Sequence, residues 1–334
     1  MRLSRLLVLI LAVAGCTASP TGQSSLDLIV PPILEQDHIP SVVIVTGDVD
    51  RVTYARAFGD ATLDTIFDLA SCTKVVATTT AVMKLVEEGK LSLDDPIGKY
   101  LKPFEGRRIT IRECLHHCSG LPAYLTPKSR TCDGILAEIA SLKPAGAGYT
   151  YSCLNMLSMA RIVEQVTRMP LAEYVRVTFF EPLGMKDTGF SPPAARCAPT
   201  APDLKGVVHD PLARSYATAE HQSGNAGLFS TGADLAIFCR ALLQGRILKP
   251  ATVAEMFEPD QHTRGLGWDV FDDPPYKPGV GHTGFTGTLL WLDPESGRFA
   301  VVLSNRVLTG EKTSVTRLRK EVLAVVNART LHGQ

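Results

Sequence analysis

A serine and a lysine three residues apart are the clearest candidates for covalent chemistry in this chain. Ser71 and Lys74 form its only Ser-x-x-Lys pair, and they open a run, residues 71–88, that reads as a helix. Positions i and i+3 of a helix share one face, so the lysine amine could take the proton of the serine hydroxyl. The free N–H groups at a helix start favour the resulting alkoxide. The sequence therefore predicts a serine nucleophile for acyl transfer.

Two later motifs could complete such a site. Tyr151 begins a Tyr-Ser-Cys sequence, and its phenol could carry the serine proton to a leaving group. Residues 281–288 are rich in glycine and threonine and enter a predicted strand. There the N–H of Phe285 could join that of Ser71 in an oxyanion hole. His282 and Thr283 could bind a substrate carboxylate or carbonyl, and Gly284 leaves room for substrate beside the strand.

Each later motif also has a purely structural interpretation. Tyr151 alone could be a partly buried side chain that closes a helix start, and residues 281–288 could be a glycine-rich strand with an ordinary histidine. The spacing of residues 279–284 matches G-x-G-x-x-G, but this run precedes a strand and no acidic residue follows about 20 positions later. We therefore reject a dinucleotide site.

Composition indicates a globular protein. The chain has 334 residues, of which 45% are hydrophobic and 20% charged, with a formal net charge of +0. It has no basic stripe, so we expect no nucleic-acid partner. It contains neither C-x-x-C nor H-E-x-x-H spacing, so the sequence assigns no metal.

The N-terminus reads as a targeting segment. Arg2 and Arg5 precede an apolar stretch, residues 6–14, that is too short to span a bilayer and suits a secretory signal. Residues 13–16 resemble a bacterial lipobox, which implies cleavage before Cys16 and lipidation of that residue. We expect a signal peptide at 1–15, a lipidated tether at 16–25, and an exported, membrane-anchored lipoprotein facing the periplasm or the cell exterior. The alternative is an ordinary signal peptide that is cut elsewhere.

Seven cysteines remain after Cys16, and export would allow some of them to pair. Cys132 and Cys197 lie in loop-like segments and are the best disulfide candidates. Cys114 and Cys118 are four residues apart on a short predicted helix, so we expect them to pack as small hydrophobic side chains.

Strand patterns occur only near the two ends of the chain. They cover residues 41–46, 51–58, 265–271, 284–292 and 298–307, with a turn at 293–297 before the last. Helical patches fill the middle, a capping-box pattern at Thr231 starts one of them, and residues 313–328 form a final amphipathic helix.

This distribution predicts an α+β fold: one antiparallel sheet, built from both chain ends and flanked by helices, with an inserted and mostly helical lobe. We expect a catalytic domain at 26–330. Its α/β lobe would comprise residues 26–75 and 262–330, and its helical lobe residues 76–261. The nucleophile would lie where the lobes meet, which is a common place for a cleft.

Taken together, the motifs resemble those of the penicillin-binding proteins and serine β-lactamases. The resemblance is to the branch with a Tyr-x-Asn middle motif, which holds class C β-lactamases, D-alanyl-D-alanine carboxypeptidases and related esterases. It covers about residues 30–325, with further matches at 67–71, 115–122 and 226–231.

This resemblance implies a β-lactamase/transpeptidase-like fold and no cofactor. Ser71 would be the acylated nucleophile, Lys74 its base and Tyr151 the proton carrier, while His282, Thr283 and Gly284 occupy the Lys-Thr-Gly position. The implied function is a serine hydrolase that acts through an acyl-Ser71 intermediate on peptidoglycan-derived D-alanyl peptides or small esters.

Two residues depart from the pattern of this family. Cys153 stands where the family has asparagine, and a thiol is a poor substitute for an amide that binds lysine and substrate. Asn155 should point elsewhere along the helix. His282 replaces a permanent charge, so carboxylate binding should weaken as the pH rises through neutrality. Both changes argue against an efficient class C-like β-lactamase, which remains an alternative, as does a non-enzymatic penicillin-binding sensor.

Overall fold

The computed structural model describes residues 24–143, 146 and 148–328. The expected signal peptide and Cys16 lie outside the described residues. Within the part of the chain that is described, no helix combines the length and the apolar character needed to cross a membrane.

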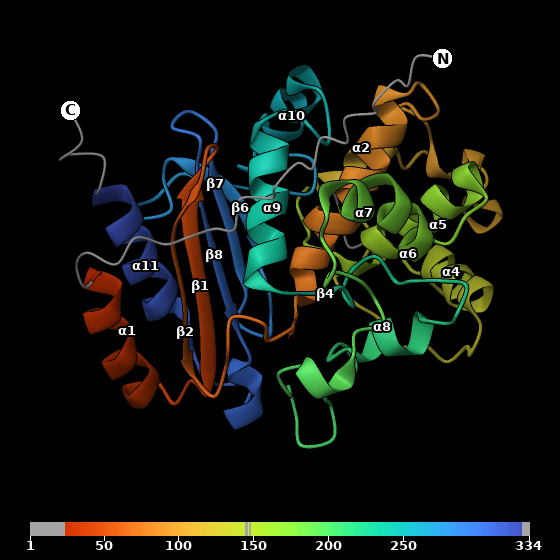
Figure 1. Cartoon of the computed structure of the whole chain (residues 1–334). Coiled ribbons are helices and arrows are strands. Elements are labelled where there is room, and N and C mark those ends of the chain that lie inside the picture. The colour runs from red at the N-terminus through yellow and green to blue at the C-terminus, as the bar shows by residue number, and fades with distance from the viewer. Residues whose placement is uncertain (1–23, 144–145, 147, 329–334) are drawn as a thin grey trace, which may run out of the picture.

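One six-stranded antiparallel sheet forms the centre of the molecule, and its strand order is β2-β1-β8-β7-β6-β5 (Figure 1). Strand β1 pairs with β8 from Val42 opposite Ser304 to Asp48 opposite Arg298, so the two ends of the chain meet in the middle of the sheet. The fold class expected from the sequence is confirmed. The strands are β1 (Ser41–Asp48), β2 (Val52–Gly59), β5 (Asp269–Phe271), β6 (Gly279–Thr283), β7 (Leu289–Asp293) and β8 (Arg298–Ser304).

Helices cover both faces of this sheet, and the sequence of β1 shows why. Successive side chains of a strand point to opposite faces. Val42 and Ile44 pack with α1 (Ser25–Gln36) and α11 (Thr316–Ala328), whereas Val43 and Val45 join the larger core on the other side. Helix α9 (Gly232–Leu243) lies against that second face (Figure 1). A strand covered on both faces needs an almost unbroken hydrophobic run.

The middle of the chain is mostly helical and lies beside the sheet (Figure 1). A two-stranded sheet, β3 (Phe67–Asp68) with β4 (Phe229–Ser230), joins it to the segment that carries Ser71. The expected boundaries of the two lobes are not tested and stay predictions. The helices of this region are α2 (Thr80–Glu87), α3 (Ile111–Leu115), α4 (Cys132–Ser141), α5 (Cys153–Thr167), α6 (Leu171–Val175), α7 (Glu181–Leu183), α8 (Pro211–Tyr216) and α10 (Pro250–Phe257).

Local signals at element ends were informative. The Thr231 hydroxyl accepts a hydrogen bond from the N–H of Asp234 at 3.3 Å and starts α9 as predicted. The predicted turn between β7 and β8 forms around Asp293, whose carboxylate accepts from the N–H groups of Glu295 and Ser296. The final helix also forms and begins at Thr316.

The sequence placed two strands wrongly. Only residues 269–271 of the predicted strand at 265–271 are extended in the sheet, as β5. The predicted strand at 284–292 begins with a turn, because the N–H of Gly284 donates to the Thr288 carbonyl and that of Gly287 to the Gly284 carbonyl. Gly287 has φ +115°, which a residue with a side chain rarely adopts.

The expected disulfide is not formed. All seven cysteines of the described residues are free. Cys132 donates from its thiol to the Tyr216 carbonyl at 3.0 Å, and Cys197 to the Pro193 carbonyl at 3.5 Å. Cys114 is fully buried as expected, but Cys118 is only partly buried and faces other polar groups.

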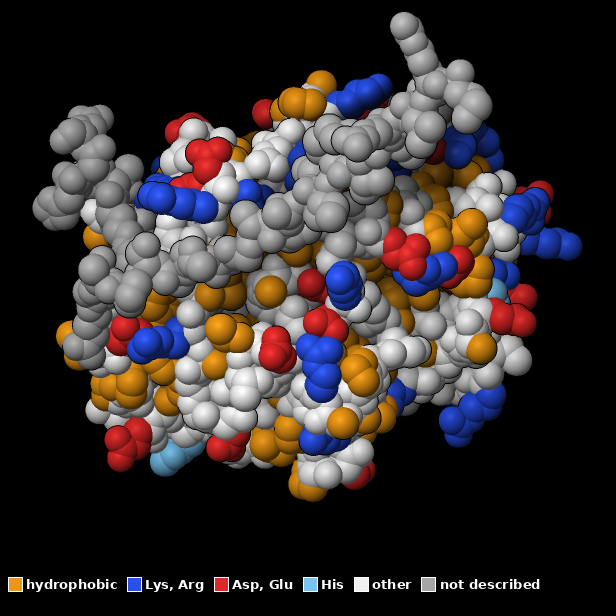
Figure 2. All heavy atoms as spheres, viewed as in Figure 1, with side chains coloured by type: hydrophobic (Ala, Val, Ile, Leu, Met, Phe, Trp, Pro, Cys, Tyr) orange, Lys and Arg blue, Asp and Glu red, His pale blue; other side chains and the backbone are white. Residues whose placement is uncertain are grey.

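Charged side chains of both signs are interspersed over the face drawn in Figure 2. This mixing matches the formal net charge of +0.

Candidate active site

Ser71 lies in a short 3₁₀ helix, η1 (Ala70–Cys72), and not at the start of a regular α-helix as the sequence predicted. The next segment, η2 (Lys74–Thr79), has π-type hydrogen bonds before α2 continues. Ser71 and Lys74 nevertheless stay together, because Lys74 Nζ donates to Ser71 Oγ at 2.9 Å across the junction of the two segments.

The backbone just before Ser71 is strained. Ala70 has φ +46°, a left-handed conformation that residues other than glycine seldom adopt. The buried Asp68 carboxylate holds this conformation by accepting a hydrogen bond from the Ala70 N–H at 2.8 Å. Desolvation by burial raises the pKa of Asp68 to about 6, against the hydrogen bonds from the N–H groups of His209 and Ala70.

Lys74 is fully buried, and its ammonium group has three neighbours in the site. Nζ donates to Ser71 Oγ at 2.9 Å and to the Asn225 carbonyl oxygen at 2.8 Å, and it lies over the Tyr151 ring. Burial opposes the charge, but Tyr151 and Cys153 outweigh it and raise the pKa of Lys74 above its ordinary value. Lys74 therefore holds its proton in the free protein.

Tyr151 lies just before α5, between two basic side chains. Its ring centroid is 5.1 Å from Lys74 Nζ and 5.9 Å from the Arg264 guanidinium carbon. The ring of the buried His117 packs on it with centroids 4.6 Å apart. His117 accepts the N–H of Ser152 on Nδ1 at 3.1 Å, so it also fixes the backbone next to Tyr151.

Hydrogen bonds connect the end of β6 and the segment that follows it to the segment that carries Ser71. The Cys72 thiol donates to the His282 carbonyl at 3.3 Å, Thr286 Oγ1 donates to the Asp68 carbonyl at 2.7 Å, and Thr288 Oγ1 donates to the Leu69 carbonyl at 2.9 Å. Burial raises the pKa of Cys72 to about 11, so this thiol is a structural contact and not a second nucleophile.

Gly284 is required by this close approach. A Cβ there would lie 2.0 Å from Thr288 Oγ1 and 2.6 Å from the Leu69 carbonyl oxygen. The turn brings Phe285 into the wall of the cavity that contains Ser71. No hydrogen-bond partner is recorded for the Phe285 N–H among the described residues, which leaves this donor available to a substrate oxygen.

His282 does not carry the charge that the sequence suggested. Burial, followed by the nearby charges of Arg264 and Lys74, lowers its pKa well below the usual value. Its Nδ1 contacts the Thr283 carbonyl at 2.7 Å, and its buried Nε2 has no partner among the described residues. The expected loss of carboxylate binding through neutral pH is therefore not supported, because the imidazole is already neutral there.

Arg264 supplies a permanent positive charge in the same cavity. Its guanidinium is paired with Asp269 through Nη1, while its buried Nε and Nη2 have no partner in the described part of the chain. The side chain is 5% exposed, which makes unsatisfied donors costly unless a ligand accepts from them. Sequence reasoning missed Arg264, since it belongs to none of the matched motifs.

The cavity brings most of the predicted site residues together. The cavity has a volume of about 550 Å³, and Arg264 lies in its wall. The predicted residues in the same wall are Ser71, Tyr151, His282, Thr283, Gly284 and Phe285. A second cavity of about 370 Å³ also reaches Ser71 and is lined by Tyr124, His209, Arg214 and Phe285, among others. Ser71 thus lies at the junction of two spaces, which suits a substrate that extends on both sides of the cleaved bond.

Two residues shortly after Tyr151, Cys153 and Asn155, are not part of this cavity wall. Cys153 begins α5 and packs against the large core. Asn155 is buried, where it accepts a hydrogen bond from Ser119 Oγ at 2.6 Å and contacts His117 Nδ1 at 3.3 Å. It points away from the substrate side, as a position two residues along a helix requires.

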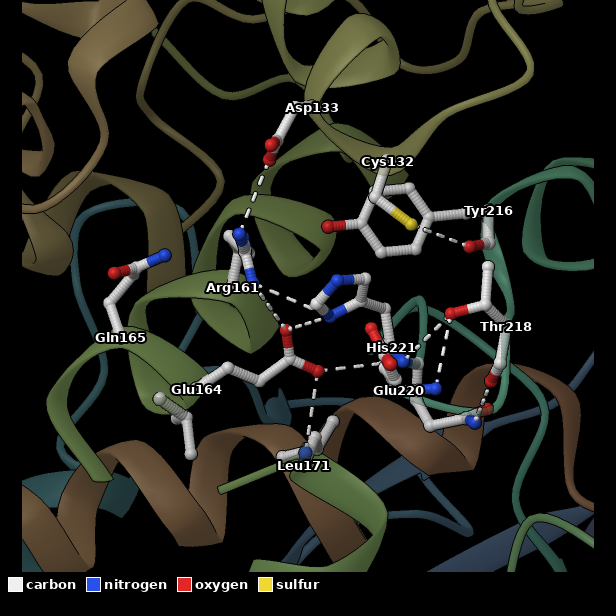
Figure 3. A network of polar contacts seen from close by, with 12 residues as sticks. Cys132, Asp133, Arg161, Glu164, Gln165, Leu171, Tyr216, Thr218, Glu220 and His221 are labelled. Carbon is white, nitrogen blue, oxygen red and sulfur yellow. Dashed lines mark hydrogen bonds and ion pairs between the residues drawn. The ribbon is translucent and has the colours of Figure 1, made fainter. Parts of the chain in front are cut away.

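A polar network joins α5 to the chain segment that follows α8 (Figure 3). Glu164 Oε2 lies 2.8 Å from His221 Nδ1 and 3.3 Å from Arg161 Nη1. Its other oxygen accepts from the N–H groups of Leu171 and Gln222. The network thus fixes the chain shortly before Asn225, whose carbonyl accepts a hydrogen bond from Lys74.

The comparisons with known proteins agree with this geometry. The model of the Beta-lactamase family matches residues 26–324. The chain belongs to the β-lactamase family. A protein of Salmonella typhimurium named "Putative D-alanyl-D-alanine carboxypeptidase" is 32% identical, over 74% of this chain and 70% of that protein.

Solved structures share the β-lactamase fold. The hydrolase EstCE1, described as having promiscuous acyltransferase activity, has a TM-score of 0.73 at 24% identity, covering 88% of this chain and 95% of its own. A class C β-lactamase from Rhodobacter sphaeroides has a TM-score of 0.72 at 21% identity, covering 89% and 97%. The chain is a serine hydrolase of the β-lactamase and penicillin-binding protein type.

Proposed function

We propose that this protein is a carboxypeptidase that removes a terminal D-alanine from peptidoglycan-derived peptides through an acyl-Ser71 intermediate. The observation that carries the proposal is the buried Arg264 guanidinium, with two unpartnered nitrogens, in the cavity of Ser71. A guanidinium offers two parallel donors to a carboxylate, and a terminal D-alanine carries a carboxylate next to the bond to be cleaved.

In the proposed mechanism, Ser71 Oγ attacks the carbonyl carbon of the penultimate residue. As Ser71 bonds to this carbon, its proton passes to the Tyr151 oxygen while the phenol proton passes to the nitrogen of the leaving D-alanine, and Lys74 keeps its charge throughout. The N–H groups of Ser71 and Phe285 stabilise the oxyanion. Water then attacks the acyl carbon, its proton passes to the Tyr151 oxygen, and the phenol proton goes to Ser71 Oγ as the acyl bond breaks.

The two cavities support an assignment of sides. The leaving D-alanine would lie toward Arg264 and His282, with its carboxylate on the guanidinium. The acyl part of the peptide would lie toward Tyr124, His209 and Phe285. His282, which is neutral, would contribute the backbone and shape of its strand and not a charge.

The decisive experiment compares a peptide that ends in D-Ala-D-Ala with the same peptide as a C-terminal amide, and with a p-nitrophenyl ester. Ser71→Ala should abolish turnover of all substrates. Arg264→Met should lower kcat/KM for the free-carboxylate peptide by about 100-fold, since hydrogen bonds to charged groups contribute about 1.5–3 kcal/mol, and should leave the ester nearly unchanged.

Lys312→Met is the matched control, because Lys312 is an exposed cation in the wall of the same cavity. If it lowers peptide turnover as much as Arg264→Met does, a general positive potential binds the substrate. Equal turnover of the acid and the amide by the unmodified protein would refute the carboxypeptidase assignment and favour small esters.

We also propose that the protein is exported and anchored by a lipid on Cys16. The support is the charged and apolar N-terminal sequence and its lipobox-like ending. Labelling of cells with a fatty-acid analogue should mark the protein and not its Cys16→Ser variant. Equal labelling of both would exclude this anchor.

A further inference from the structure

A second group of reactive side chains lies beside the cavity, outside the machinery described above. Cys118 follows α3, whereas Asp260 and His262 follow α10, more than 140 positions later in the chain. The sulfur, a carboxylate oxygen and an imidazole nitrogen of these three residues all lie within 4.8 Å of one another. Sequence spacing could not reveal this group, because the fold brings together two distant segments.

The carboxylate of Asp260 is held in one orientation. Its Oδ1 accepts from the N–H groups of His262 at 2.8 Å and Arg264 at 3.1 Å. Its Oδ2 is turned toward the Cys118 thiol at 3.8 Å and lies 3.7 Å from His116 Nδ1. One oxygen therefore fixes the loop, while the other faces the sulfur and stays available as a ligand.

We propose that Cys118, Asp260 and His262 form a binding site for a zinc ion. Thiolate, imidazole and carboxylate are the three ligand types that Zn²⁺ takes, and together they disfavour the hard cations Mg²⁺ and Ca²⁺, which prefer oxygen alone. All three residues are partly exposed, so an ion can reach them from solvent. Three protein ligands leave the fourth tetrahedral position to water.

The ligands have fixed partners behind them, as metal ligands usually do. His116 Nδ1 lies 3.0 Å from the Arg264 carbonyl, and it closes the polar ring next to Asp260. The His262 ring lies 5.8 Å from the Tyr149 ring, centroid to centroid. Such neighbours limit the rotation of the ligands before the ion arrives and so reduce the entropic cost of binding.

The site is coupled to Arg264 through the backbone. The N–H of Asp260 donates a hydrogen bond to the Arg264 carbonyl at 2.8 Å, and the N–H of Arg264 donates one to the Asp260 carboxylate. Two ligands thus belong to the loop that carries Arg264. Occupancy should stiffen this loop and lower KM for substrates with a free carboxylate; only this second consequence rests on the proposed function.

Binding is tested without reference to activity. The purified full-length protein is freed of metal and titrated with Zn²⁺ against a chromophoric chelator. We expect one ion per chain with Kd below about 1 μM. Replacement by Co²⁺ should give thiolate-to-cobalt absorption in the near ultraviolet. Cys118→Ser should remove that absorption and weaken Zn²⁺ binding at least 100-fold. His262→Gln should weaken Zn²⁺ binding by the same factor.

Cys197→Ser is the control, because Cys197 is another free thiol but bonds only to a backbone carbonyl. It should leave binding unchanged. Circular dichroism shows whether each variant is folded, and Asp260→Asn gives an independent third test. No binding at micromolar Zn²⁺, or binding that survives Cys118→Ser in a folded protein, overturns the site. If Zn²⁺ binds but KM does not change, the proposed site stands and only its proposed coupling to Arg264 is refuted.

Discussion

The Glu164 carboxylate of α5 and the His221 imidazole lie 2.8 Å apart (Figure 3). His221 lies four residues before Asn225, whose carbonyl accepts a hydrogen bond from Lys74 Nζ. Between them the Gly224 carbonyl accepts from Thr78 Oγ1 at 2.8 Å. The position of the buried lysine therefore depends on a polar network outside the cavity.

Removal of the Glu164 side chain should destabilise the protein and lower its rate of ester hydrolysis. The carboxylate is buried and satisfies two N–H groups besides Arg161 and His221, so Glu164→Ala should lower the free energy of unfolding by about 3–5 kcal/mol. Ester hydrolysis by the folded fraction should also slow. Chemical denaturation and initial rates measure the two effects.

Glu173→Ala is the matched control for this change. Glu173 is a helix residue whose side chain is 44% exposed and pairs with Arg176 at 2.7 Å. Its removal should leave the midpoint of denaturation nearly unchanged. Equal destabilisation by both substitutions would show that the buried network has no special role.

Substrate binding should not depend on histidine titration near neutrality. Burial lowers the pKa of His282 well below its usual value, so the imidazole is already neutral at neutral pH and stays neutral as the pH rises, whereas an arginine side chain is always charged. KM for a D-Ala-D-Ala peptide should therefore stay flat as the pH rises through neutrality, in the wild type and in His282→Gln. A tenfold rise in KM with pH, absent from His282→Gln, would show that a charged imidazole binds the carboxylate.

Asp68 should make stability decline as the pH rises from acid to neutral. Its pKa is raised from 3.8 to about 6, so the unfolded chain ionises first and the folded state loses relative stability between these values. Two pKa units correspond to about 3 kcal/mol. Asp68→Asn does not titrate, so its stability relative to the wild type should improve by about this amount from pH 4 to 7.

Denaturation at several pH values checks the Asp68 prediction. Loss of an acceptor for the N–H of His209 or Ala70 will add a constant cost to the variant, which does not affect the slope. A difference between the two proteins that stays constant with pH would mean that Asp68 is ionised at both ends of the range.

Cys153 should limit hydrolysis of β-lactams. An amide at this position could bond to Lys74, which a thiol does poorly. We expect weak nitrocefin turnover by the wild type, and an increase of about tenfold or more in Cys153→Asn, since a hydrogen bond to a charged group contributes about 1.5 kcal/mol or more. Cys153→Ala separates the amide from mere loss of the thiol, and it should give no gain. Fast turnover by the wild type would contradict the expectation.

Sequence alone predicted the sheet and the part of the cavity wall around Ser71, because both leave local signals. The alternating and continuous hydrophobic runs mark the strands, and Ser71, Tyr151 and His282 each lie in a recognisable motif. Arg264 and His117 act through contacts that only the fold creates, so no local pattern pointed to their role. The lowered pKa of His282 could not be predicted either, because it results from burial, which is a property of the packed molecule.

The turn at 284–288 shows another limit. Its residues look extended by composition, yet Thr286 and Thr288 bond to the backbone at Asp68 and Leu69, and these distant contacts decide the chain path. Propensity cannot predict a conformation that a partner more than 200 residues away imposes.

The pairing of β1 with β8 has a consequence for biogenesis. The strand that begins at Ser41 has no neighbour on its inner side until the ribosome has made Ser304. The sheet can therefore close only after the residues up to Ser304 have been synthesised, and until then β1 lacks this partner. Any early stop before Arg298 would leave a hydrophobic strand edge open to self-association.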